Sequence, residues 1–401
     1  MIQIKDKTKC VGCGCCAFTC PSQCITLKPD NEGFIYPYVD EGTCIKCGKC
    51  HQVCLVENPL PRPSIPFPKT MMAAYIRNDD TRMASSSGGI FPALAHDIIK
   101  KGGVVYGAAF ISNDRVQHIR VSSYHDIKKL QGSKYVQSDI YCIIPTIIKD
   151  IKNGLPVLFS GTPCQVKALN NLLGNAPPKN LLSIEVVCHG VPSPMVFSRY
   201  MKEMKASCIS FRNKERGWSD YDVVIHQADG RTIKEKASQN VYMKGLIQNL
   251  TLRPSCSSCP ARSFSSRADI TLGDLWGIQH IAPQLFDDKG TSVVFLHSPK
   301  GMSMWLDNSG QFVIKELDDY AKVIKYNPCI STSFPKSKKR DAFFSKSATH
   351  STIELLTRYT SCPDSIFKII TSTFLKTWIA AWKTYVYIRD HISQSVRSRK
   401  S

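Results

Sequence analysis

A repeated cysteine pattern near the N-terminus constrains this chain more than any other feature of its sequence. Eight cysteines form two runs of the same spacing, with two, two and three residues between neighbours. The runs are Cys10, Cys13, Cys16, Cys20 and Cys44, Cys47, Cys50, Cys54. Every matched position is offset by 34 residues. Self-similarity at a fixed offset predicts two similar structural halves, related by a pseudo-twofold axis.

The triple spacing in each run is typical of a ligand loop for a four-iron cubane cluster. Three cysteines of a run bind one cluster, and the fourth reaches the other cluster. We therefore expect cluster I to bind Cys10, Cys13, Cys16 and Cys54, and cluster II to bind Cys20, Cys44, Cys47 and Cys50. A zinc site uses paired cysteines instead of a triple run. Residues 1–57 are thus predicted to form a two-cluster bacterial-type ferredoxin domain, although Leu55 replaces the proline that follows the fourth cysteine in the first run.

Cysteine usage also indicates the compartment. The chain holds 18 cysteines in 401 residues, and no charged-then-apolar signal segment precedes Cys10. Dense cysteines in a reducing compartment indicate metal ligands and not disulfides. We therefore expect a cytoplasmic protein. The sequence has no run of eighteen uncharged apolar residues, which argues against a transmembrane span.

Composition divides the rest of the chain into three regions. Residues 58–70 are a linker, with five prolines among the eleven residues 58–68, which favours an extended spacer. Residues 71–330 alternate short apolar strands with helical stretches, as in an α/β domain. Residues 331–401 are basic and helical. The predicted fold class is α+β: a ferredoxin domain, a mixed α/β core and a C-terminal helical basic tail.

The alternation in the core can be placed along the sequence. Strands are expected at 104–110, 156–160, 181–187, 270–272 and 292–297. Helices are expected at 89–101, 141–152, 165–173 and 194–205.

Four groups of residues in the core carry chemistry. Small residues at a helix start, 84–89, can bind a phosphate or can be a plain helix cap. The segment 132–138 offers a lysine and an aromatic ring beside a glycine, or is a surface turn. Cys164 and Cys188 each follow an expected strand, at the sheet edge where ligands bind in open α/β folds. Cys256 and Cys259 form a Cys-x2-Cys pair that can be redox-active, zinc-binding or cluster-binding.

Taken together, these motifs resemble the coenzyme F420 hydrogenase/dehydrogenase beta-subunit family. The resemblance covers residues 71–300 and follows the order SSSGG, GSKYVQS, GTPCQ, CHGVPSP, CSSCP and DITLGDLWG. It implies a core that binds flavin adenine dinucleotide (FAD) and a cluster of its own. In archaeal members the partner is coenzyme F420, whereas many bacterial members are encoded beside polysaccharide genes. The flavin contacts expected from the motifs are Ser86, Ser87, Gly88, Gly89, Gly132, Ser133, Lys134, Tyr135, Gly161 and Thr162.

The resemblance also implies a third four-iron cluster in the core. The cysteines available to bind it are Cys164, Cys188, Cys256 and Cys259. The alternative is that Cys164 or Cys188 is an inert buried thiol. The motifs assign no catalytic residue.

The tail carries a large part of the positive charge. The whole chain has a net charge of +20, and residues 336–401 hold 13 Lys or Arg against 4 Asp or Glu. A helix expected over 365–392 has aromatic side chains on one face and lysines on another. Such a helix can dock on the core, on a partner, or on the inner face of a membrane as a peripheral contact. No interleaving of basic and aromatic residues marks the core, so nucleic-acid binding is not expected.

Two functions remain open from the sequence. The first is a flavin-dependent iron–sulfur oxidoreductase, which converts hydride transfer into single-electron transfer to a redox partner protein or soluble carrier. The second is a non-catalytic electron-transfer subunit of a larger complex. Bound flavin with hydride exchange separates the two.

Overall fold

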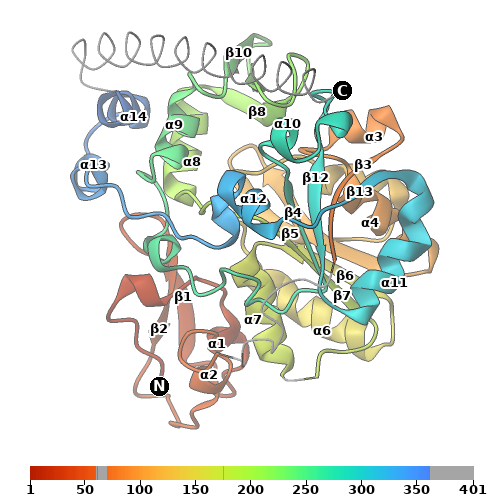
Figure 1. Ribbon diagram of the computed structural model, residues 1–401. Helices are drawn as coiled ribbons and strands as arrows, with labels where there is room; N and C mark the ends of the chain where they lie inside the picture. Colours follow the sequence, from red (N-terminus) through yellow and green to blue (C-terminus); the bar gives the residue numbers. More distant parts are fainter. Residues whose placement is uncertain (60, 62–69, 175, 362–401) are drawn as a thin grey trace, which may run out of the picture.

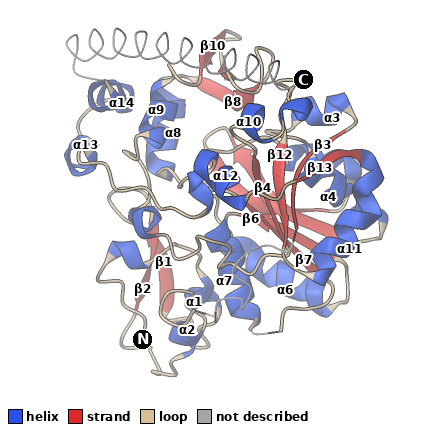
Figure 2. Cartoon of the chain, in the orientation of Figure 1, coloured by secondary structure: helices blue, strands red, loops and turns tan. Residues whose placement is uncertain are grey.

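The structure is a computed structural model that describes residues 1–59, 61, 70–174 and 176–361. The N-terminal domain lies beside a large mixed sheet, at the lower left of Figure 1. A smaller sheet with its own helices forms a third part of the structure. Helices and strands are both abundant, and helices flank the central sheet (Figure 2). The α+β class expected from the sequence is confirmed.

The N-terminal domain consists of two similar halves. Each of its helices begins after a glycine in the left-handed region, Gly14 at φ +75° and Gly48 at φ +76°. These glycines are 34 residues apart, so the sequence repeat is also a structural repeat. The two strands pair antiparallel, with Ile25 opposite Val39. The elements are α1 (Cys15–Phe18), β1 (Ile25–Pro29), β2 (Ile35–Val39) and α2 (Lys49–Gln52).

An eight-stranded mixed sheet forms the centre of the chain. Four neighbouring strands, β11, β7, β6 and β4, run parallel, and the remaining strands are antiparallel to their neighbours. The parallel strands are largely buried on both faces. β4 and β6 begin with continuous apolar runs, whereas β7 alternates apolar residues with the buried Ser183 and Glu185. In spatial order the strands are β13 (Phe312–Glu316), β3 (Thr70–Ile76), β12 (Ser292–Leu296), β11 (Ile270–Asp274), β7 (Leu181–Val186), β6 (Val157–Gly161), β4 (Val104–Ser112) and β5 (Arg115–Val121).

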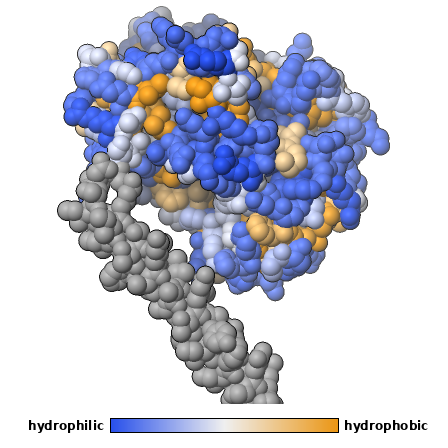
Figure 3. Space-filling view, turned by 90° about the horizontal axis from the view of Figure 1, so that it is seen from above, coloured by the Kyte–Doolittle hydropathy of each residue, from blue (hydrophilic) through white to orange (hydrophobic). Residues whose placement is uncertain are grey.

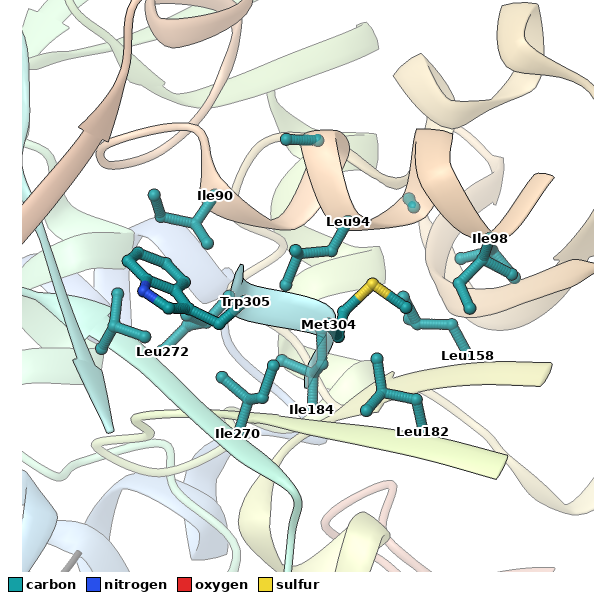
Figure 4. Close-up of a cluster of buried hydrophobic side chains, with 14 of the residues drawn as sticks. Ile90, Leu94, Ile98, Leu158, Leu182, Ile184, Ile270, Leu272, Met304 and Trp305 are labelled. Atoms are coloured by element: carbon teal, nitrogen blue, oxygen red, sulfur yellow. The ribbon is translucent and has the colours of Figure 1, made fainter. Parts of the chain in front are cut away.

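Helices cover both faces of this sheet. On one face, apolar side chains of α4 repeat every four residues, at Ile90, Leu94 and Ile98, and meet Met304 and Trp305 of α11 over the strands (Figure 4). That face carries α4 (Ile90–Lys100), α5 (Ile127–Leu130) and α11 (Pro299–Asn308). The opposite face carries α6 (Ile144–Lys152), α7 (Pro163–Leu173), α10 (Ile278–Ile281) and α12 (Tyr320–Tyr326). The short α3 (Asp79–Ala84) follows β3.

A second, three-stranded antiparallel sheet supports a separate apolar cluster. Phe343 of α13 and Leu355 and Leu356 of α14 enter this cluster, so the first part of the expected tail packs on the core. The elements are α8 (Pro194–Glu203), β8 (Ala206–Asn213), β9 (Asp222–Gln227), β10 (Thr232–Lys236), α9 (Val241–Ile247), α13 (Arg340–Lys346) and α14 (Thr352–Thr360).

The strands and helices expected in the core are all present, within three residues at their starts and two at their ends. The helix expected over 365–392 lies outside the described residues. In the described ranges no helix is both long and apolar enough to span a membrane. The face seen in Figure 3 is mostly hydrophilic, with apolar side chains in small groups. The domain boundaries proposed from composition remain a prediction.

Candidate functional site

Two small cavities in the N-terminal domain receive the eight repeated cysteines. Cys10, Cys13, Cys16 and Cys54 line the first cavity, and Cys20, Cys44, Cys47 and Cys50 line the second. Each cavity thus combines three cysteines of one run with the fourth cysteine of the other. This exchange is the one that two-cluster ferredoxins use. The donor set and its placement fit one cubane cluster in each cavity.

The two cavities differ in their surroundings. Burial, and then the charges of Cys13 and Cys10, raise the thiol pKa of Cys16 well above its ordinary value. The pKa of Cys13 is lowered to about 7, chiefly by the side-chain interaction with Cys15. Cys13 also packs in one apolar cluster with Cys164 of α7. Cys47, in contrast, is exposed. The cluster I cavity therefore faces the core, and the cluster II cavity reaches the surface.

Four further cysteines gather beside the cluster I cavity. Cys164 lies in the first turn of α7, Cys188 follows β7, and Cys256 lies in the turn Pro254–Ser258, three residues before Cys259. Burial, and then the charges of Cys259 and Cys256, raise the thiol pKa of Cys164 to about 12. Burial and the charges of Cys256, Cys164 and Cys259 raise the pKa of Cys188. The four cysteines named from the motifs are therefore mutual neighbours, which we call the core cysteine group.

The geometry of these groups bears on the kind of metal they suit. In the described ranges, no three His, Cys, Asp or Glu side chains converge closely enough to hold a single metal ion. A cubane binds each thiolate at a different iron, so its ligands stand further apart than the ligands of one ion. The triple cysteine spacing of the two ferredoxin runs, and not a paired spacing, favours clusters over zinc there.

A cavity of about 320 Å³ opens at the carboxyl ends of the parallel strands β6, β7 and β11. Ligands of open α/β sheets bind at this edge, and the volume lies in the range of small-molecule sites. The Ser86 and Ser133 hydroxyls are 2.8 Å apart, so the two motifs that carry them meet at the cavity. Nine of the ten expected flavin contacts line it: Ser86, Ser87, Gly89, Gly132, Ser133, Lys134, Tyr135, Gly161 and Thr162.

Gly88, the tenth expected contact, lies behind the cavity wall. Its amide donates a hydrogen bond of 3.0 Å to the Ser292 hydroxyl. A Cβ at this position would stand 2.5 Å from the Ala74 carbonyl oxygen and 2.8 Å from the Ser292 amide nitrogen. Gly88 thus allows the start of α4 to pack closely on β3 and β12. A bulky substitution there would disturb the sheet and not the cavity alone.

Arg212, on β8, brings to this cavity a buried charge that no motif indicated. One guanidinium nitrogen, Nη1, forms an ion pair with Asp274, and the group lies 4.5 Å from the centre of the Tyr221 ring. Its Nε and Nη2 atoms are buried without a hydrogen-bond partner among the described residues. Leaving buried donors unpaired is costly. These two N–H groups therefore fit an anionic group of a ligand, such as a dinucleotide phosphate.

Two other residues in the wall are shaped by burial. Burial lowers the pKa of Lys134 to about 7, and its Nζ donates to the Gln131 carbonyl at 2.6 Å. Burial also lowers the pKa of His118 to about 4, so the imidazole is neutral. Its Nε2 lies 2.9 Å from the Ser160 carbonyl oxygen, which can only accept, so Nε2 carries the proton. His118 escaped the sequence reasoning because a lone histidine in a strand gives no signal.

The cavity, the core cysteine group and the ferredoxin domain adjoin one another in that order. Cys188 lines the cavity and belongs to the core cysteine group. The charge of Cys13 contributes to the raised pKa of Cys164, which places the core cysteine group beside the cluster I cavity. The only exposed cysteine of the eight in the repeat, Cys47, lies at the far end of this series.

Polar contacts hold the ferredoxin domain against the core (Figure 1). Arg340 forms a forked ion pair with Glu32, with Nη1 2.7 Å from Oε1. The Gln137 amide donates to the Val11 carbonyl at 3.1 Å, and the Asn171 amide donates to the Val53 carbonyl at 3.1 Å. The ferredoxin domain is thus docked on the core through bonds at several points.

Two family models match the chain, one in the core and one in the ferredoxin domain. Residues 155–320 match the family described as the C-terminal part of the beta subunit of coenzyme F420 hydrogenase/dehydrogenase. Residues 9–58 match the 4Fe-4S dicluster domain. A chain in a solved structure of the F420-reducing NiFe hydrogenase complex from Methanosarcina barkeri is similar at 17% identity, with a TM-score of 0.47. That similarity covers 73% of this chain and 96% of the other. No curated protein matches the chain.

Proposed function

We propose that this chain is an iron–sulfur flavoenzyme of the coenzyme F420 hydrogenase/dehydrogenase beta-subunit family, because residues 155–320 match the C-terminal part of that subunit and residues 9–58 match a 4Fe-4S dicluster domain. It exchanges hydride with a soluble carrier, either coenzyme F420 or another carrier or substrate, and single electrons with a redox partner protein in the cytoplasm. The observation that carries the proposal is the position of Cys188, which lies in both the cavity wall and the core cysteine group.

Several residues in the cavity wall support FAD binding. The Arg212 N–H groups without partners would bind a phosphate, and the half-buried Lys134 beside them adds positive charge below pH 7. Ser86 and Ser133 bring hydroxyls to the same wall. A bound flavin supplies the step that clusters cannot perform, since it takes or gives two electrons at once, whereas each cluster carries one. The protein's part is to bind, orient and enclose it.

The core cysteine group would hold a third four-iron cluster through Cys164, Cys188, Cys256 and Cys259. Its place between the cavity and cluster I supports a relay in which electrons pass from the cavity to the core cluster, then to cluster I and cluster II. A cluster held by Cys20, Cys44, Cys47 and Cys50 would be the one to exchange electrons with a redox partner, because the exposed Cys47 gives that end of the relay access to solvent.

Binding of FAD to the anaerobically reconstituted full chain tests the proposal. We expect one FAD per chain, measured after acid release, and reduction of the clusters when reduced coenzyme F420 is added. Arg212→Gln should weaken FAD binding by about 10- to 100-fold, since a hydrogen bond to a charged group contributes about 1.5–3 kcal/mol. Arg216→Gln is the matched control, because Arg216 lies outside the cavity wall and its side chain is 48% exposed.

The outcomes separate the two candidate functions. A wild-type chain that loads its ferredoxin clusters but binds no FAD is an electron-transfer subunit, and the enzymatic proposal is then wrong. Equal loss of FAD in the Arg212 and Arg216 variants would remove Arg212 from the site. If another hydride donor reduces the clusters and reduced coenzyme F420 does not, the soluble carrier is a different molecule, and the proposal of a flavoenzyme still stands.

A further inference from the structure

Arg253 occupies the boundary between the core and the ferredoxin domain, and neither the motifs nor the proposed relay assigns it a role. Its side chain is 2% exposed although it carries a full charge. It precedes Pro254 and the loop of the core cysteine group. Its own carbonyl accepts a hydrogen bond of 3.0 Å from the amide of Cys256, which belongs to that group. The backbone of Arg253 is therefore part of the core cluster loop.

The side chain points the other way, into the ferredoxin domain at cluster I. Its Nε donates to the Cys10 carbonyl at 2.8 Å, and its Nη2 lies 3.8 Å from the Cys10 sulfur. The guanidinium stands over the Tyr36 ring, 4.5 Å from its centre. A Cβ on Gly12 would lie 2.6 Å from Nη1, so the glycine in the ligand loop makes room for this cation. One residue thus touches a cluster I ligand while its backbone supports a ligand of the next cysteine group.

Within the described part of the chain, no carboxylate forms an ion pair with this cation. Besides the Cys10 sulfur, the guanidinium donates to the carbonyls of Cys10 and Ile35 and to the amide oxygen of Gln137, all three uncharged. By contrast, Arg340 at the same boundary is paired with Glu32.

The reduction of a cubane adds one electron and one negative charge to an anionic cluster. A buried cation beside a ligand stabilises the more negative, reduced form more strongly than the oxidised form. Net charge and hydrogen bonds to the sulfurs are among the factors that set cluster potentials. We propose that Arg253 is a positioning residue for electron transfer, whose charge and N–H···S contact raise the reduction potential of cluster I so that it accepts electrons from the core.

The role of Arg253 does not depend on the direction of electron flow. An electron resides on cluster I whether it moves from the cavity to cluster II or in reverse. Lowering the potential of cluster I therefore raises the barrier from both sides. The inference concerns the ferredoxin domain and needs no flavin, so it can fail while the proposed function stands, and the reverse also holds.

Redox titration of the reconstituted full chain, followed by electron paramagnetic resonance, tests the proposal. Cluster I is identified as the signal that Cys54→Ser alters. Arg253→Gln should lower the equilibrium constant for reducing cluster I by about tenfold or more, which is about 59 mV for a one-electron step. Arg253→Lys keeps the charge but loses the planar fork, so its shift should have the same sign and be smaller. The signal of cluster II should stay in place.

Arg340→Gln is the matched control, since Arg340 is another buried arginine at the same boundary, 3% exposed, and makes no contact with a cluster ligand. It should leave the potential of cluster I unchanged. An unshifted potential in Arg253→Gln, with iron content and circular dichroism intact, overturns the proposal, as does an equal shift in Arg340→Gln. Should Arg253→Gln fail to hold cluster I, the lysine variant decides: a downward shift supports the proposal, and no shift or an upward shift overturns it.

Discussion

Serine substitution of Cys164 and Cys259 together tests whether the core cysteine group holds a cluster. Cys164 lies on α7 and Cys259 lies in the loop after Pro254–Ser258. Substituting both removes two of the four ligands and keeps one cysteine, Cys256, in that loop. Three four-iron clusters bind about twelve irons per chain and two bind about eight. We therefore expect the double variant to lose about four irons and about one third of the cluster absorbance, and to slow electron transfer from flavin to the ferredoxin domain.

Cys329 provides the matched control for this experiment. Its sulfur lies 3.8 Å from Nδ1 of His189, the residue after Cys188, and its carbonyl and that of Cys188 accept bonds from the same arginine, Arg262. Burial raises the thiol pKa of Cys329 and the Arg262 charge opposes this, but no cysteine of the core group contributes. Cys329 is therefore close to the core cysteine group but not a member of it. The Cys329→Ser variant should keep the full iron content of the wild-type chain.

Iron is measured by a colorimetric chelator after anaerobic reconstitution, with flavin content and circular dichroism recorded on the same samples. Full iron content in the double variant would contradict the core cluster, and electrons would then pass directly from the flavin to the ferredoxin domain. Loss of four irons in Cys329→Ser, with none lost in the double variant, would assign a different set of ligands. Loss of all iron together with the folded signal would be resolved by the single variants, each of which should lose no more than four.

Three further predictions concern docking, titration and the tail. Glu32→Gln leaves the buried Arg340 unpaired and should lower the free energy of unfolding by about 3 kcal/mol in urea denaturation, the low end of the cost of breaking a buried pair because Glu32 is 18% exposed. Arg340→Gln removes the buried charge itself and leaves a carboxylate that water can reach, so it should cost less and keep the domain docked. No loss in Glu32→Gln would mean that the contact does not stabilise the docked domain. Burial lowers the pKa of Lys134 from 10.5 to about 7, so at pH values between these two the unfolded chain binds a proton that the folded chain does not. The free energy of unfolding without flavin should therefore rise from pH 7 to pH 9. Lys134→Met should reduce that rise, and the same pH profile in the variant and the wild type would contradict the lowered pKa. Deletion of residues 365–401 should leave the cluster and flavin spectra unchanged and should alter association with a partner or with lipid. If the full-length chain does not sediment with anionic vesicles at low salt, the membrane contact is ruled out. If the shortened chain unfolds, the deleted segment docks on the core as a helix.

Local spacing was sufficient to predict the ferredoxin domain and most core elements. The Cys-x2-Cys-x2-Cys loops are set by residues close together in the chain, and the left-handed glycines that start α1 and α2 recur at the same offset. Strands such as β7 and helices such as α4 follow from apolar patterns of period two and period 3.6. The motifs at 85–89 and 132–138 could be associated with one cavity because their order along the chain resembles a known family.

The rest depends on contacts between distant parts of the chain, which no local pattern encodes. Arg212 enters the cavity wall from the second sheet, and its two donors without partners are visible only once the residues around it are in place. Gly88 belongs to a motif, yet packing against the Ala74 carbonyl decides that it supports the sheet and does not face the cavity. Arg253 looks like an ordinary residue before a proline in the sequence. Only the docking of the ferredoxin domain on the core brings its guanidinium to the carbonyl of Cys10, 243 residues away in the sequence. Sequence thus determined which atoms can ligate or bond, because that chemistry is local. The tertiary structure decided which of them meet, because burial and charge act through space.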